Sequence, residues 1–218
     1  MRKTIQPIVF LLPLTLGLGA CVSSVTSTGM RAPSSSASHV SDSPYQGVWL
    51  KPSADLSRRL RDQGARMPYL HTPQEKYDLV RWLSDQGEVA YPLLLETVAT
   101  GNSAAAQIAL SALASSGDPR LLPVLDEIPF PGPEAGLLRL ERARCHMVLG
   151  DWDHAPVLIE GLGSKRPLVR GLCLKALRDT TRMQFGFEPQ GDEPDREAAI
   201  QRWQAWSAAR SQDAFQQG

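Results

Sequence analysis

The chain has 218 residues, with 23 basic and 23 acidic side chains. Residues 1–20 contain Arg2 and Lys3 but no acid, so the chain without them carries 21 basic and 23 acidic residues. This balance excludes general nucleic-acid binding, which needs a strongly basic domain. Residues 45–218 are enough for one domain with a hydrophobic core. In the second half of the chain Ala, Leu, Arg and Glu outnumber the β-branched residues, and this composition favours helix.

The N-terminus has the pattern of a secretory signal. Arg2 and Lys3 precede an apolar stretch over residues 5–18, and residues 18–21 read Leu-Gly-Ala-Cys. The apolar stretch contains two prolines and is shorter than the roughly 20 residues that a spanning helix needs. An ordinary cleaved signal remains an alternative.

The Leu-Gly-Ala-Cys run resembles the lipobox of bacterial lipoproteins. The resemblance implies that residues 1–20 are removed and that Cys21 becomes a lipidated N-terminus. Several acyl chains on one cysteine would anchor the protein firmly to a membrane. Val22 follows the cysteine, which favours the outer membrane, facing the periplasm, over the inner membrane. Residues 21–44 are rich in Ser, Thr, Ala, Pro and Gly, and we expect a disordered tether there.

Residues 45–86 are expected to form an N-terminal helical segment. A short helix is predicted near 54–63. A second begins at Thr72, where Pro73 occupies the first helical position and Glu75 completes a capping box.

From residue 87 the chain repeats itself. Gly87, Gly117 and Gly150 are each followed by an acidic residue and then by a proline a few positions on. The glycine can end one helix and the acidic residue can start the next. A fixed period of this kind predicts stacked helix pairs.

The second helix of the third unit, residues 167–177, resembles that of HEAT repeats, with the pattern Val-Arg-x-x-Ala-x-x-Ala-Leu. Arg170 and the Ala-Leu pair at 176–177 match, and Cys173 takes the place of a small residue. In the second unit Arg142 and Cys145 fall on the same register. Tetratricopeptide repeats are the main family that could be confused with this pattern.

The resemblance implies an all-α fold, an α-solenoid of about three HEAT-like helix pairs over residues 87–180. Residues 181–210 are similar to the segment that closes many bacterial HEAT-repeat proteins. We expect a C-terminal helical cap there, in which Trp203 and Trp206 cover the last apolar face. Residues 211–218 are expected to fray.

Two cysteines, Cys145 and Cys173, remain in the folded part of the chain. Their shared position on successive stacked helices places them 8–10 Å apart, too far for a disulfide. We expect two buried free thiols, with a disulfide bridge as the alternative.

Nothing in the sequence rises to a catalytic motif, so we predict no catalytic residue, no cofactor and no enzyme activity. The sole gathering of metal-ligand residue types is Cys145, His146, Asp151, Asp153 and His154. It has no Cys-x-x-Cys or His-x-x-x-His frame, and the two aspartates are explained as helix starts. We therefore predict no metal site.

Basic residues are frequent in the second helices of units two and three. If these helices line one surface, several arginines could form a basic strip that binds carboxylate or phosphate groups. The alternative is a solvated face on which Arg142 and Arg170 are structural residues of the repeat. The predicted partner-binding residues are Arg139, Arg142, Arg166, Arg170 and Arg178.

Together these patterns predict a lipid-anchored envelope protein that acts as a non-catalytic adaptor for an envelope protein partner. The main alternative is a structural envelope factor that binds an anionic cell-wall or lipid polymer through the basic strip. A lyase-type or metal-dependent enzyme is a minor alternative, since HEAT-like repeats occur in lyases that attach bilin pigments.

Overall fold

The computed structural model describes residues 45, 48–100, 102–129 and 135–216. Every regular element in these ranges is helical, with nine α-helices and four short 3₁₀ helices, so the prediction of an all-α fold is confirmed. The described residues belong to one compact unit. Cys21, the predicted signal and the predicted tether lie outside them. No helix among the described residues is both long enough and apolar enough to cross a membrane.

The N-terminal helices begin where their capping residues predict. Helix α1 spans Ala54–Arg66, three residues beyond the predicted end, and Ser53 accepts a hydrogen bond from its first turn. The 3₁₀ helix η1 (Met67–Tyr69) follows, and α2 spans Pro73–Asp85. The capping box at Thr72 and Glu75 is confirmed, with both reciprocal hydrogen bonds at 3.2 Å. The hydroxyl of Thr72 also donates to the Glu75 carboxylate at 2.6 Å, and this bond, with the one from the Thr72 backbone N–H, lowers the pKa of Glu75.

The three repeat glycines all have left-handed backbone angles. Gly87, Gly117 and Gly150 have φ of 61°, 68° and 100°, a region that side chains disfavour. Gly117 and Gly150 stand between the end of one helix and the start of the next, and Gly87 is the first residue of the 3₁₀ helix that follows α2, as the repeat predicts.

The acidic residues after these glycines do not all act alike. Asp118 and Asp151 each accept a hydrogen bond from the backbone N–H two residues on, at 3.0 and 3.1 Å, and so cap the next helix. Glu88 caps nothing; its carboxylate instead pairs with the guanidinium of Arg120.

The remaining helices alternate short and long elements. Each first helix of a pair begins with a 3₁₀ turn and carries its proline at the start of the α-helical part. The elements are η2 (Gly87–Ala90), α3 (Tyr91–Ala99), α4 (Ser103–Ser116), η3 (Pro119–Leu121), α5 (Leu122–Glu127), α6 (Ala135–Val148), η4 (Trp152–His154), α7 (Ala155–Leu162), α8 (Pro167–Thr181) and α9 (Glu193–Gln216).

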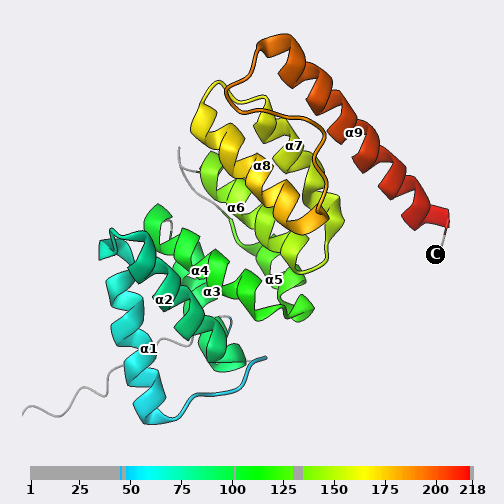
Figure 1. The fold of residues 1–218 in the computed structure, drawn as a ribbon. Helices are drawn as coiled ribbons and strands as arrows, with labels where there is room; N and C mark the ends of the chain where they lie inside the picture. Colours follow the sequence, from blue (N-terminus) through cyan, green and yellow to red (C-terminus); the bar gives the residue numbers. More distant parts are fainter. Residues whose placement is uncertain (1–44, 46–47, 101, 130–134, 217–218) are drawn as a thin grey trace, which may run out of the picture. The chain divides into compact units, whose positions relative to one another are not determined.

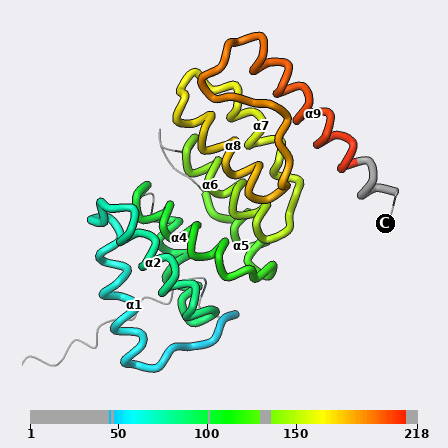
Figure 2. Tube along the Cα trace, viewed as in Figure 1, coloured from blue at the N-terminus to red at the C-terminus, as the bar shows by residue number. Residues whose placement is uncertain are grey.

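The longer helices pack in series. Helix α2 lies against α4, α4 against α6, and α6 against α8, while α3 pairs with α4 and α7 with α8 (Figure 1). The segment between α8 and α9 runs back along α8 (Figure 2), where Arg170 of α8 donates a hydrogen bond to the carbonyl of Pro189. Helix α9 then packs on α7.

The buried apolar side chains form two clusters. The first gathers around α2, α3 and α4 and the second around α7, α8 and α9. Helix α6 contributes to both, because Leu138 and Cys145 belong to the first cluster and Ala143 and Met147 to the second.

The C-terminal tryptophans lie at the second cluster. Trp203 is fully buried, and its ring meets Phe185 edge to face at 4.7 Å between centroids. Trp206 is half-buried and contacts both Trp203 and Trp152. Helix α9 continues to Gln216, so the boundary at residue 210, where we expected fraying, does not end the helix. No Gly or Pro follows Pro194 until residue 218, and the Ala, Gln and Arg residues between them favour helix.

Cys145 and Cys173 are buried and free, which confirms the prediction of two unpaired thiols. Burial raises the pKa of each thiol to about 12. Both therefore stay protonated at neutral pH and pack as small apolar side chains.

Candidate functional site

Two of the five predicted partner-binding arginines are structural. Arg170 is buried, and its guanidinium donates to the carbonyl oxygens of Pro189, at 2.7 Å from Nε, and of Ser164, at 2.8 Å from Nη1. Arg142 is half-buried, and its Nη1 donates to the carbonyl oxygens of Leu125 (3.1 Å) and Ile128 (2.8 Å) at the end of α5.

Their contacts favour the alternative interpretation, and their part in a partner-binding strip stays an untested prediction. Arg142 satisfies carbonyl groups at the end of α5, where a helix leaves its last carbonyls without an internal partner. Arg170 satisfies the carbonyl of Ser164, just after α7, and that of Pro189, in the segment between α8 and α9. The alternative interpretation, structural arginines of the repeat, fits both positions.

The other three predicted arginines are exposed. Arg139 pairs with Glu160 of α7 at 3.2 Å. Arg166 immediately precedes α8 and Arg178 lies in its last turn, which places them about 18 Å apart along the helix axis. Neither takes part in the ion pairs found among the described side chains.

Helix α8 also exposes apolar side chains. Leu168 is 75% exposed and Leu172 is 40% exposed. Four residues apart, they lie on the same face of the helix. This exposed leucine pair lies between Arg166 and Arg178 along the chain.

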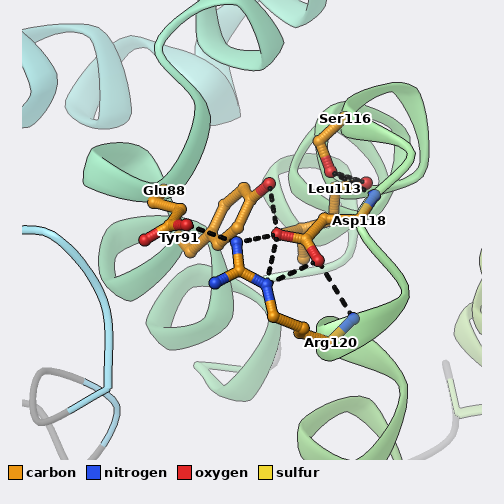
Figure 3. A network of polar contacts seen from close by, with 6 residues as sticks. All are labelled: Glu88, Tyr91, Leu113, Ser116, Asp118 and Arg120. Carbon is orange, nitrogen blue, oxygen red and sulfur yellow. Dashed lines mark hydrogen bonds and ion pairs between the residues drawn. The ribbon is translucent and has the colours of Figure 1, made fainter.

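A polar network joins the first and second helix pairs (Figure 3). Arg120 binds the carboxylates of Asp118 and Glu88, and the hydroxyl of Tyr91 donates to Asp118 at 3.3 Å. The hydrogen bonds from Arg120 lower the pKa of Asp118, and burial raises the pKa of Tyr91. The positive charge of Arg120 is paired with the carboxylates of Asp118 and Glu88. We therefore interpret the network as a structural connection between the first and second helix pairs.

A second polar cluster lies at the junction of α5, α6 and η4, and it includes three of the five residues whose spacing predicted no metal site. His146 is on α6 and His154 ends η4. Their rings stack with centroids 3.8 Å apart and an angle of 26° between the planes. Asp151 lies beside both rings, with its Oδ2 2.9 Å from Nδ1 of His146 and 3.0 Å from Nδ1 of His154.

Asp151 fixes which ring nitrogen carries the proton. Burial acts to raise the pKa of Asp151, but hydrogen bonds from His146 and from the backbone of Asp153 outweigh it, and the net pKa is lowered. An ionised carboxylate accepts hydrogen bonds and donates none, so the Nδ1 atoms of His146 and His154 are the donors. Burial lowers the pKa of His146, which favours its neutral form.

The Nε2 atoms of both rings then face a carboxylate from another helix. Asp126 of α5 places Oδ1 3.6 Å from Nε2 of His146 and 3.7 Å from Nε2 of His154. Asp126, His146 and His154 offer ligand atoms that all lie within 4.8 Å of one another. Among the described residues, these three side chains could together hold a metal ion. The other two discounted residues do not join them, because Cys145 is buried in the first apolar cluster and Asp153 contributes its backbone N–H.

Sequence reasoning missed Asp126. It lies 20 residues before His146 and on a different helix, so no local spacing marks it. The carboxylate meets the two histidines only because the end of α5 lies near the end of α6 and near η4.

Comparison with protein-family models, with curated proteins and with solved structures finds no match to this chain.

Proposed function

We propose that the protein is a lipid-anchored component of a bacterial envelope, with a HEAT-like α-solenoid that acts as a non-catalytic adaptor for a partner protein. Two features support the solenoid. The helices α2, α4, α6 and α8 pack in series, and left-handed glycines recur at intervals of 30 and 33 residues between positions 87, 117 and 150. Stacked helix pairs of this kind offer a continuous binding surface.

The lipid anchor rests on the Leu-Gly-Ala-Cys run that ends at Cys21. We expect the wild-type protein to incorporate labelled palmitate in a bacterial host, and Cys21→Ala to lose at least about nine-tenths of the label, because the acyl chains need the thiol. Labelled protein is quantified on a gel against total protein. Ser23→Ala, two residues away, is the matched control and should keep the label. Equal labelling of Cys21→Ala would contradict the anchor.

The exposed leucine pair on α8 carries the adaptor proposal. A monomeric protein gains nothing by exposing two leucines on one face, whereas a partner that covers them gains apolar burial. Arg166 and Arg178 flank the pair with exposed positive charge. We therefore expect a partner segment with an apolar centre and acidic ends.

Affinity capture from detergent-solubilised envelopes tests this docking face. The baits are the wild type, Leu168→Asp with Leu172→Asp, and Arg166→Glu with Arg178→Glu. We expect one protein to be enriched by the wild type and reduced at least about tenfold in both variants, since truncating a central contact costs more than about 1.4 kcal/mol.

The matched control changes the same charges elsewhere. Arg61→Glu with Arg81→Glu alters exposed positions on α1 and α2 and should capture the partner normally. Capture that is equal for all baits would remove α8 from the proposal. Loss with the control as well would point to net charge as the cause.

A further inference from the structure

We propose that Asp126, His146 and His154 form a binding site for one divalent transition-metal ion of the Zn²⁺ class. This inference is independent of the adaptor function. It rests on how the three side chains meet at the junction of α5, α6 and η4.

The first support is the way the two rings are held. Asp151 contacts Nδ1 of His146 and of His154, which leaves Nε2 of each ring as the nitrogen that faces Asp126. These two nitrogens and a carboxylate oxygen of Asp126 all lie within 4.8 Å of one another, and imidazole nitrogen and carboxylate oxygen are both zinc ligands.

The second support is a buried nitrogen without a partner. The side chain of His146 is fully buried, yet its Nε2 has no hydrogen-bond partner among the residues that the structure describes. Its separation from Asp126, 3.6 Å, is too long for one. A buried polar atom left unpaired costs free energy, and a metal ligand bond would satisfy it.

The third support is the spacing of the ligand atoms. Zn²⁺ binds histidine nitrogen and carboxylate oxygen at about 2.0–2.2 Å in a tetrahedron, so neighbouring ligand atoms lie about 3.4 Å apart. The two nitrogen–oxygen separations here are 3.6 and 3.7 Å. Small rotations of the exposed Asp126 side chain and of the half-buried His154 ring would close the difference.

The surroundings match those of a metal centre. Histidine ligands of metals commonly donate their second ring N–H to a carboxylate, which fixes the ring, and Asp151 plays that role for both rings. Two histidines and one carboxylate leave the fourth position open. The Asp126 side chain is 56% exposed, so the cluster reaches the protein surface.

Arg142 is a cation that competes for Asp126. It interacts electrostatically with Asp126, but its Nη1 donates to the carbonyl oxygens of Leu125 and Ile128. The metal ion and Arg142 would therefore share the negative charge of Asp126.

Zn²⁺ binding by the purified full-length chain tests the site. The protein is stripped with a chelator, dialysed against micromolar Zn²⁺ and analysed for metal content, and affinity is measured by competition with a chromophoric chelator. We expect one equivalent in the wild type. Asp126→Asn and His154→Gln should each bind Zn²⁺ more than about 100-fold more weakly, beyond the loss typical of residues that only orient ligands.

Two variants serve as matched controls. Asp153→Asn changes an exposed neighbouring carboxylate, and His71→Gln changes an exposed histidine on another part of the chain. Both should bind like the wild type. Asp126 and His154 are not fully buried, so their variants should keep the wild-type circular dichroism spectrum even if His146→Gln does not fold.

Zn²⁺ should also raise the Tm of the wild type, and of neither ligand variant, because it binds the folded state alone. Failure of the wild type to retain Zn²⁺ would overturn the proposal. Wild-type affinity in either Asp126→Asn or His154→Gln would overturn the three-ligand site.

Discussion

Replacing Gly161 with alanine is expected to lower the free energy of unfolding by about 1–2 kcal/mol. Gly161 lies in α7 where α8 approaches closely, and an added Cβ would overlap the Sγ atom of Cys173 and lie 3.1 Å from Cδ2 of Leu140. Such overpacking costs about 1–3 kcal/mol or more. The higher helix propensity of alanine stabilises α7 by about 1 kcal/mol, which is less than the cost expected for the overlap with Sγ of Cys173.

Urea unfolding followed by circular dichroism measures this change. Gly171→Ala is the matched control, because Gly171 lies inside α8 and an added Cβ there meets no atom within 4 Å. That variant should be more stable than the wild type by about 0.5–1 kcal/mol. A second control adds Cys173→Ala to Gly161→Ala, which removes the overlapping sulfur and should recover part of the loss. Equal stability of the two glycine variants would contradict the close approach of α7 and α8.

Replacing Trp203 with alanine is expected to cost about 3–5 kcal/mol, the range for large aromatic side chains in cores. Trp203 is fully buried and packs edge to face on Phe185 and on Trp206. Its removal takes the largest side chain out of the second apolar cluster and leaves a cavity under α9.

Trp206→Ala is the matched control, since Trp206 lies on the same helix but is only half-buried. It should cost about half as much or less, in proportion to the smaller apolar area that it buries. Trp203→Phe is a second comparison. It keeps most of the apolar volume and removes a buried indole N–H that has no hydrogen-bond partner among the described residues, so it should cost clearly less than alanine. Thermal unfolding that ranked Trp206→Ala as the more damaging change would contradict this account of the cap.

Local signals predicted the helix boundaries. The capping box at Thr72 and the turns at Gly87, Gly117 and Gly150 depend on residues within a few positions of one another, so the sequence alone specifies them. The all-α class followed from composition and from the repeated pattern in the same way.

Long-range contacts could not be predicted in this way. The pattern marked Arg142 and Arg170 as unusual, but their carbonyl acceptors lie 14 to 19 residues away or in a loop without a motif. The sequence spacing of His146 and His154 does not match a known metal-binding pattern. Their rings stack only because of how η4 packs beside α6, which linear spacing does not show. Asp126 carried no local signal at all. Side chains that meet only through tertiary packing are the ones that a single sequence leaves unassigned.

Helix α6 has a consequence for how the protein melts. Cys145 faces one apolar cluster, Met147 faces the other, and His146 stands between them in the chain. If either apolar cluster unfolds locally, α6 loses the packing on one of its two faces. A change in the stability of one cluster therefore affects the stability of the other through α6. We therefore expect the two clusters to unfold together, and an ion bound to His146 in the last turn of α6 would stabilise both.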